Sequence, residues 1–185
     1  MKTFAEILAF TLSWEGGWSN DPDDAGGATA CGITEKTFKA YDIDNDGDGD
    51  CDVEDLKLIT MEQVEQIYVD GYWNQNFLCA DEFQASPSSL SWPMDAVAFD
   101  TAVNSGHKRA MKCLQEALCL DIDGVIGEQT ANALNAVTDP LIVALNACDS
   151  RERFVRSLAK NKPSQVKFLN GWLRRINGLR EFIKG

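Results

Sequence analysis

Apolar residues recur at helical spacing over most of the chain. Near the N-terminus, Phe4, Ile7, Leu8 and Leu12 fall on one face, and the segment Thr3 to Glu6 matches a capping box. The same spacing predicts further helices over 34–41 and 60–73, from Pro93 onward, around 110–118, near Thr130, and over 139–160 and 164–183. No long segment alternates with period two. The pattern therefore predicts an all-α fold.

A polar interruption follows the first helix. Gly16 and Gly17 end the helical pattern, and the residues from Trp18 to Gly32 are rich in Asn, Asp, Pro and Gly. These residue types favour turns over helix. We expect an ordered loop or one short hairpin there, within an otherwise helical fold.

Length and composition are those of a globular protein. The 185 residues, 44% hydrophobic and 25% charged, suffice for one domain or for two small packed halves. No apolar run reaches the roughly 18 residues of a membrane span. Glu6 and Glu15 interrupt the apolar N-terminus and no small-residue cleavage site follows, so we predict a mature helix and no signal peptide.

The charge of the chain is unevenly distributed. The net charge is −12, yet residues 151–185 hold ten Lys or Arg against two acids, Glu152 and Glu181. An acidic body argues against nucleic acid as a partner. The basic C-terminal segment is either a solvated helix face or a surface attracted to an anionic polymer such as cell wall.

The cysteines and the histidine limit the metal sites and nucleophiles that the chain could contain. The six cysteines show no CxxC spacing, and we expect reduced, mostly buried thiols: Cys31, Cys51, Cys79, Cys113, Cys119 and Cys148. His107 is the single histidine, which excludes zinc sites that need two or three. A Cys31–His107 pair remains as the only histidine-dependent nucleophile.

An acidic run has the spacing of a calcium-binding loop. From Asp44, acids occupy loop positions 1, 3, 5, 9 and 12, and Gly49 occupies position 6, where the chain must turn. We predict one structural Ca²⁺ held by six residues, with Asp50 contributing its backbone carbonyl: Asp44, Asp46, Asp48, Asp50, Asp52 and Asp55. The alternative is a solvated acidic linker. Aspartate at position 12, followed by Leu56, resembles the loop of dockerin modules.

Glu15 is the carboxylate best placed for chemistry. It ends an apolar helix between Trp14 and Trp18, and two glycines after it leave room for a substrate. Burial against aromatic faces raises the pKa of a carboxyl group, as a general acid near neutral pH requires. A surface glutamate at a helix end is the alternative.

The sequence after Glu15 resembles a family signature. It reads EGGWSNDPDDAGGATACGIT over residues 15–34 and is similar to the E-G-G-x-x-N-D-P-x-D-x-G-G-x-T-x-x-G-I-T pattern of the glycoside hydrolase family 108 N-acetylmuramidases, found in phage endolysins and bacterial lysozyme-like proteins. Residues 99–106, 110–115, 123–130 and 171–176 resemble the predicted peptidoglycan-binding segment of that family. The calcium-type loop departs from the pattern and looks inserted.

The resemblance implies a fold and a division of the chain. We predict a lysozyme-like bilobal fold with the cleft between the signature loop and the C-terminal helices. Residues 1–90 form the catalytic region, with the calcium-loop insertion at 42–58, and residues 91–185 form a helical peptidoglycan-binding-like region packed on it.

The resemblance also implies site roles. It assigns Glu15 as the catalytic acid, and related lysozyme folds suggest Asp24 as base and Thr29 as the residue that holds the attacking water, with Asp21 and Asp23 as competitors for the base. Trp18, Asn104, Ser105 and Gly106 are candidates for the sugar cleft, although a capped helix end explains the last three as well. Whether configuration inverts depends on the carboxylate separation.

The implied function is that of an endolysin, which hydrolyses the β-1,4 bond between N-acetylmuramic acid and N-acetylglucosamine. The alternatives are a Cys-His amidase or peptidase acting on the wall peptide, and a non-catalytic peptidoglycan-binding protein. We expect a monomer with no organic cofactor, of phage or prophage origin. It is made in the cytoplasm of a bacterial host and acts at the wall after release.

Overall fold

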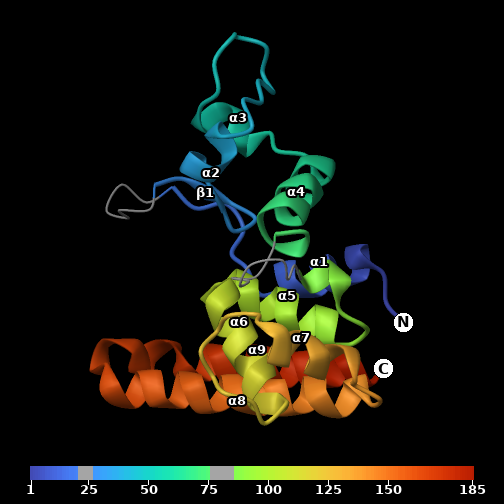
Figure 1. Ribbon diagram of the computed structural model, residues 1–185. Coiled ribbons are helices and arrows are strands. Elements are labelled where there is room, and N and C mark those ends of the chain that lie inside the picture. The colour runs from blue at the N-terminus through green and yellow to red at the C-terminus, as the bar shows by residue number, and fades with distance from the viewer. Residues whose placement is uncertain (21–26, 76–85) are drawn as a thin grey trace. The chain divides into compact units, whose positions relative to one another are not determined.

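The computed structural model describes residues 1–20, 27–75 and 86–185 (Figure 1). The chain divides into two compact units, which are described separately. The first unit spans Thr3–Asp70. The second spans Gly71–Gly185 together with Met1–Lys2.

The first unit begins with α1 (Phe4–Leu12), whose capping box at Thr3 and Glu6 is present as predicted. A two-stranded antiparallel hairpin follows, β1 (Thr29–Ala30) and β2 (Ile33–Thr34), with Thr29 opposite Thr34. Thr29 also forms an isolated bridge with Ser19. The prediction of a short hairpin in this region is therefore confirmed.

Short helices complete the first unit: α2 (Glu35–Lys39), α3 (Val53–Lys57), α4 (Met61–Tyr68) and the π-helical turn η1 (Val69–Trp73), which runs into the second unit. Another capping box, formed by Thr60 and Gln63, starts α4 where the predicted helix over 60–73 begins. The core of the unit consists of small and aliphatic side chains with two aromatic rings: Ile7, Leu8, Ala28, Ala30, Ile33, Phe38, Leu56, Val64, Ile67 and Tyr68.

The second unit is helical in the residues described: η2 (Pro87–Ser89), α5 (Met94–Ser105), α6 (His107–Ala117), α7 (Glu128–Asn135), α8 (Pro140–Asn161), η3 (Pro163–Gln165) and α9 (Val166–Lys184). The two longest helices, α8 and α9, form an antiparallel hairpin (Figure 1). All residues of α5 from Met94 to Ala102 are buried, as expected of a central helix that packs against neighbours on every side.

A buried charge network joins three of these helices. Asp100 of α5 is fully buried and receives hydrogen bonds from Arg151 of α8 and Arg175 of α9. The pKa of Asp100 is raised by burial but lowered more by the two guanidinium charges, so it lies below its ordinary value. Paired charges of this kind tolerate burial, whereas an isolated one does not.

The observed elements confirm the prediction of a mainly helical, lysozyme-like fold. The helix predicted over 139–160 is α8, and the one over 164–183 is η3 followed by α9. Within the described residues, no helix is both long and apolar enough to cross a membrane.

Candidate active site

Glu15 lies just beyond the end of α1. The N–H of Ser13 donates to Ala9 and Phe10, and the N–H of Glu15 donates to the carbonyl of Leu12, so the last turn continues up to the glutamate. The side chain of Glu15 is half-buried. A carboxyl group in this position is fixed by the helix end and remains accessible from one side.

Gly32 and Tyr68 are the neighbours that the geometry places against Glu15. Gly32 has φ +77°, and a Cβ built on it would lie 2.7 Å from the Tyr68 hydroxyl oxygen, 3.3 Å from Cγ of Glu15 and 3.4 Å from its Oε2. The Tyr68 hydroxyl donates a hydrogen bond of 2.9 Å to the carbonyl of Cys31. Only glycine at position 32 leaves room for a tyrosine hydroxyl and a carboxylate over the same stretch of backbone.

Sequence reasoning did not find the role of Tyr68. Its position on the apolar face of a predicted helix indicated core packing, and the ring is indeed buried. The signal that was available was the single glycine of the hairpin turn, Gly32, since a left-handed glycine often marks a close approach of side chains to backbone.

The two tryptophans beside Glu15 in sequence are both partly exposed. The Trp14 ring packs edge-on against Phe10, with ring centroids 6.2 Å apart. The Trp18 ring lies 5.5 Å below the ammonium group of Lys57. Trp18 is 44% exposed, which leaves much of its ring available to a ligand.

Thr29 lies in the hairpin that follows. Its N–H and C=O pair with those of Ser19 at 2.8 and 2.9 Å, and its hydroxyl donates to the carbonyl of Gly27 at 3.4 Å. The candidate bases Asp21, Asp23 and Asp24 lie outside the described residues. The roles of Asp24 and Thr29 therefore stay predictions.

The acidic loop is a closed turn tied down by its own backbone. Asp44, at loop position 1, accepts hydrogen bonds from the N–H groups of Gly47 at 2.6 Å and Gly49 at 3.0 Å, and Gly49 has φ +95°. Asp55, at position 12, is buried and accepts from the N–H groups of Asn45, Asp46 and Asp52.

Oxygen ligands in this loop gather in two groups. The carboxylates of Asp44, Asp46 and Asp48 form one group and those of Asp50, Asp52 and Asp55 the other, each within 4.8 Å.

Like charges raise the pKa of one acid of the loop, and backbone N–H groups lower that of another. The pKa of Asp50 is raised first by the charge of Asp48, then by burial and the other acids. The N–H of Asp52, followed by other amides, lowers the pKa of Asp55. A group of hard oxygen donors under mutual repulsion has the donor chemistry that suits Ca²⁺.

Asn104, Ser105 and Gly106 occupy the end of α5 in the second unit. Oδ1 of Asn104 accepts a hydrogen bond of 3.1 Å from Nη2 of Arg151 and one of 3.3 Å from the Ser105 hydroxyl. Gly106 has φ +84° and caps the helix by donating to the carbonyl of Ala102. These residues therefore combine a helix cap with an amide held by the buried charge network.

The alternative nucleophile pair is divided between the two units, with Cys31 in the first and His107 in the second. The ring of His107 stacks on Tyr72 with centroids 5.7 Å apart, and burial lowers its pKa. Cys31 is half-buried. Five cysteines of the described residues are free thiols, Cys31, Cys51, Cys113, Cys119 and Cys148, and Cys79 lies outside the described residues.

Comparisons with known proteins cover both units. The family model described as Glycosyl hydrolase 108 matches residues 8–106, and the one described as Predicted Peptidoglycan domain matches residues 109–177. The solved structure of SagA from Brucella abortus matches with a TM-score of 0.70 and 29% identity, covering 97% of this chain and 92% of that chain. A comparison with curated proteins gives no match.

The fold, the half-buried glutamate and these matches define a lysozyme-like glycoside hydrolase that degrades peptidoglycan. The hydrolase model spans more than half of the residues, so the chain belongs to the glycosyl hydrolase 108 family. The predicted enzyme class and substrate are confirmed, and the Cys-His alternative is not favoured. The predicted domain boundary after residue 90 stays a prediction. It lies between the division of the compact units after Asp70 and the end of the first family match at residue 106.

Proposed function

We propose that Glu15 is the general acid for hydrolysis of the β-1,4 bond between N-acetylmuramic acid and N-acetylglucosamine. The observation that carries this proposal is the placement of its half-buried carboxyl group against Gly32 and beside the Tyr68 hydroxyl. A general acid must come within hydrogen-bond distance of the glycosidic oxygen, and the solvent-accessible part of the Glu15 side chain permits that contact.

In the proposed reaction, Glu15 donates its proton to the oxygen of the leaving sugar as the glycosidic bond breaks. A positioned acid contributes roughly 10² to 10⁴ in rate. Asp24 is proposed as the base that activates water from the opposite face, with Thr29 holding that water. A carboxylate separation of about 6.5 to 9.5 Å between Glu15 and the base leads to inversion, and about 5 to 5.5 Å to retention.

The test is Glu15→Gln, which keeps the size of the side chain and removes its acid. We expect the variant to release no reducing ends from purified cell walls and to keep the melting temperature of the parent. Glu65→Gln is the matched control, because Glu65 is an exposed glutamate of α4 in the same unit. Mass spectrometry of the released fragments identifies the bond. Full lysis by Glu15→Gln would falsify the assignment.

We also propose that the acidic loop binds one structural Ca²⁺ through Asp44, Asp46, Asp48, Asp50, Asp52 and Asp55. The donor set and the hydrogen bond from Gly49 to Asp44 support this proposal. Calcium should raise the melting temperature and EGTA should reverse the change. Asp44→Asn should abolish the response, whereas Asp42→Asn, an exposed acid outside the loop, should keep it. An identical melting temperature with and without calcium contradicts the site.

We propose that the enzyme acts as a monomer of phage or prophage origin, made in a bacterial cytoplasm and reaching the wall after release. Light scattering during gel filtration tests the oligomeric state. Expression of the chain in bacterial cells tests the requirement for release. We expect the cells to lyse only when their membrane is permeabilised.

A further inference from the structure

The end of α5 forms part of a hollow in the second unit. The hollow has a volume of about 180 Å³ and is lined by two polar side chains of α5 and by apolar side chains of α8 and α9: Asn104, Ser105, Phe154, Val155, Leu158 and Trp172. Its lining comes from both family segments, since Asn104 and Ser105 lie in the hydrolase match and the others in the peptidoglycan-domain match.

The buried charge network fixes the orientation of the Asn104 amide. Arg151 donates through Nη1 to Asp100 at 2.6 Å and through Nη2 to Oδ1 of Asn104 at 3.1 Å. Because a guanidinium group only donates, the atom of Asn104 that faces it must be the oxygen. The amide nitrogen of Asn104 is thereby directed away from Arg151 with both of its N–H groups available.

Two donors in the hollow have no partner within the described residues. Nδ2 of Asn104 and Nε1 of Trp172 make no hydrogen bond there, and neither is among the buried unpaired atoms of that part of the chain. Both therefore reach solvent. A ligand that enters the hollow meets N–H donors, and so must offer an oxygen acceptor to be bound well.

Two of the apolar side chains that line the hollow are aromatic, Phe154 and Trp172. Phe168 lies 5.9 Å from Trp172, between ring centroids, and 46% of its surface is exposed. The guanidinium group of Arg109 lies 3.7 Å from the centroid of Phe154 and covers one face of that ring. Trp172 lines the hollow together with Asn104, and its ring pairs with that of the exposed Phe168, which is not part of the lining. An aromatic ring beside an amide donor suits the flat apolar face of a sugar ring.

We propose that this hollow is a glycan subsite that binds one N-acetylated amino sugar of the peptidoglycan strand. The sugar ring packs on Trp172, and Nδ2 of Asn104 donates to the carbonyl oxygen of the acetamido group. Arg151 is a positioning residue, because it acts through the orientation of Asn104. The subsite rests on the proposed action on peptidoglycan and adds to it a point at which the second unit holds the strand.

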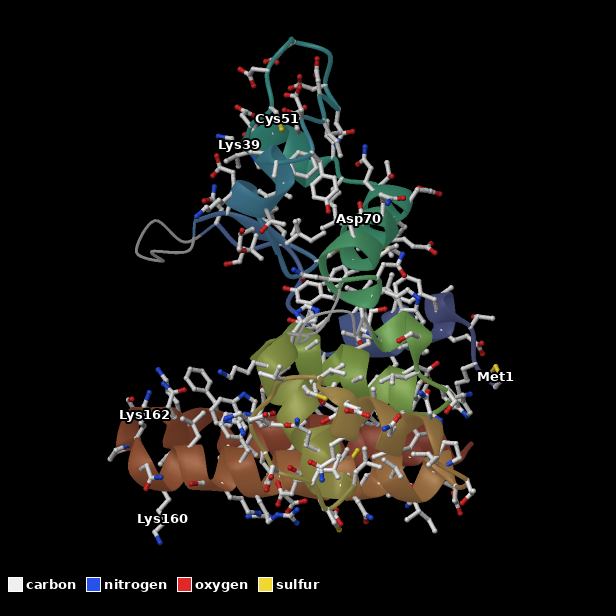
Figure 2. The ribbon with its side chains drawn as sticks, in the orientation of Figure 1. Met1, Lys39, Cys51, Asp70, Lys160 and Lys162 are labelled. Carbon is white, nitrogen blue, oxygen red and sulfur yellow. The ribbon has the colours of Figure 1, made fainter. Side chains whose placement is uncertain are left out.

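Charge at the end of the helix hairpin supports a wall polymer as the occupant. Lys160, in the last turn of α8, and Lys162, which follows that helix, are both exposed (Figure 2). Peptidoglycan carries carboxylates on its peptide groups, so cations on the same helix hairpin attract the strand, while the uncharged side chains that line the hollow fit a neutral sugar.

The test is an NMR titration of the full-length Glu15→Gln chain, in which turnover is absent. The probes are the β-1,4 trimer of N-acetylglucosamine, the same trimer without its acetyl groups, and a free stem peptide. We expect the acetylated trimer alone to shift the indole N–H signal of Trp172 and the side-chain amide signals of Asn104.

Variants assign the binding. Trp172→Ala and Asn104→Asp should each weaken binding of the acetylated trimer about tenfold, the equivalent of ~1.4 kcal/mol. Asn104→Asp retains an oxygen acceptor for Arg151 and replaces the N–H donors with a second carboxylate oxygen. Ile142→Ala, at an exposed apolar position elsewhere in the unit, is the matched control and should bind as the parent does.

Two results overturn the subsite. One is a response of these signals to the stem peptide and not to the acetylated trimer. The other is a titration in which the acetylated trimer shifts NMR signals of residues 3–70 only. If the wild-type chain still releases wall fragments in either case, the subsite fails and the proposed function stands. The titration needs no substitution in the hollow, so a variant that does not fold leaves the answer intact.

Discussion

Nη1 of Arg151 lies 2.6 Å from Oδ2 of Asp100, and the exposed fractions of the two side chains are 1% and 0%. A second arginine, Arg175, approaches Oδ1 of the same carboxylate at 2.8 Å. One aspartate therefore pairs with two guanidinium groups from two different helices. Removing it leaves two buried positive charges facing each other, a situation that folded proteins rarely tolerate.

We expect Asp100→Asn to lower the free energy of unfolding by about 3 to 5 kcal/mol, because the variant leaves both arginines uncompensated. Urea denaturation measures this change. Glu181→Gln is the control, since the Glu181–Lys184 pair is solvent-exposed and should change stability by less than about 1 kcal/mol. Equal stability of the two variants contradicts a structural role for the network.

The same network predicts the response to acid. The pKa of Asp100 is lowered on folding, so its contribution to stability is complete above the unfolded pKa and is lost as the pH falls through the lower folded pKa. The parent chain should therefore lose stability on acidification. The difference between parent and Asp100→Asn should shrink at low pH in denaturation curves recorded at several pH values.

Gly32→Ala tests the packing around Glu15. The added Cβ falls 2.7 Å from the Tyr68 hydroxyl oxygen and 3.3 Å from Cγ of Glu15, so both side chains must move. A displacement of this size at a catalytic acid should lower kcat at least tenfold. Assay of reducing-end release on purified walls gives the rate.

Gly47→Ala is the control for backbone strain. Gly47 has φ +83°, close to the +77° of Gly32, but a Cβ there meets nothing within 4 Å. Both variants should lose about 1 kcal/mol of stability from the left-handed conformation. Only Gly32→Ala should lose activity. If the two variants lose activity equally, the contact with Glu15 is not the cause.

The pattern of apolar positions predicted the helices well because most of them bury one face or are fully enclosed. Thr3 and Thr60 start two helices with capping boxes, and the apolar helix that follows Pro93 is buried at Val97, Ala98, Thr101 and Ala102. Capping boxes and apolar helix faces can be predicted because they depend on residues that lie three or four positions apart in the sequence.

The pairings between distant residues could not be read in the same way. Asp100 contacts arginines 51 and 75 positions away, and Tyr68 reaches the carbonyl of Cys31 across 37 positions. Arg151 and Arg175 were counted in the sequence as part of a basic surface, yet both are buried. Spacing along a chain gives no information on which helix will supply a partner. A charged residue that is buried in the fold therefore cannot be distinguished in the sequence from one that is exposed to solvent.

The buried carboxyl group of Asp95 should make stability depend on pH in the direction opposite to that of Asp100. Burial raises its pKa to about 6, with partial compensation from the N–H of Ala96. The folded state binds this proton more tightly than the unfolded state does. The contribution of Asp95 to the free energy of unfolding is therefore most favourable below pH ~4, and it decreases as the pH rises to about 6.

Asp95→Asn removes the charge, so it should stabilise the protein at pH 7.5 by about 1 to 2 kcal/mol, a value reduced for solvent screening, and by almost nothing at pH 4. Melting temperatures of parent and variant at the two pH values measure the effect. An equal gain in stability at both pH values would mean that the variant acts through packing and not through the titration of Asp95.

Gln115 holds the turn between α6 and α7 with both ends of its amide. Nε2 donates to Oδ1 of Asp123 at 2.7 Å, the carbonyl of Val125 at 3.0 Å and Oγ1 of Thr130 at 3.3 Å, and Oε1 accepts from the N–H of Gly124 at 2.7 Å. The side chain is only 1% exposed.

Gln115→Met keeps the volume but leaves buried polar groups without partners, which should cost about 2 to 4 kcal/mol in unfolding free energy. Gln129→Met, at an exposed position of α7, is the matched control and should be close to neutral. Because Gln115 lies in the segment matched by the peptidoglycan-domain model, its loss should also weaken sedimentation with purified walls more than it slows hydrolysis of soluble fragments. A variant that melts and binds walls like the parent shows that the turn is held by its backbone alone.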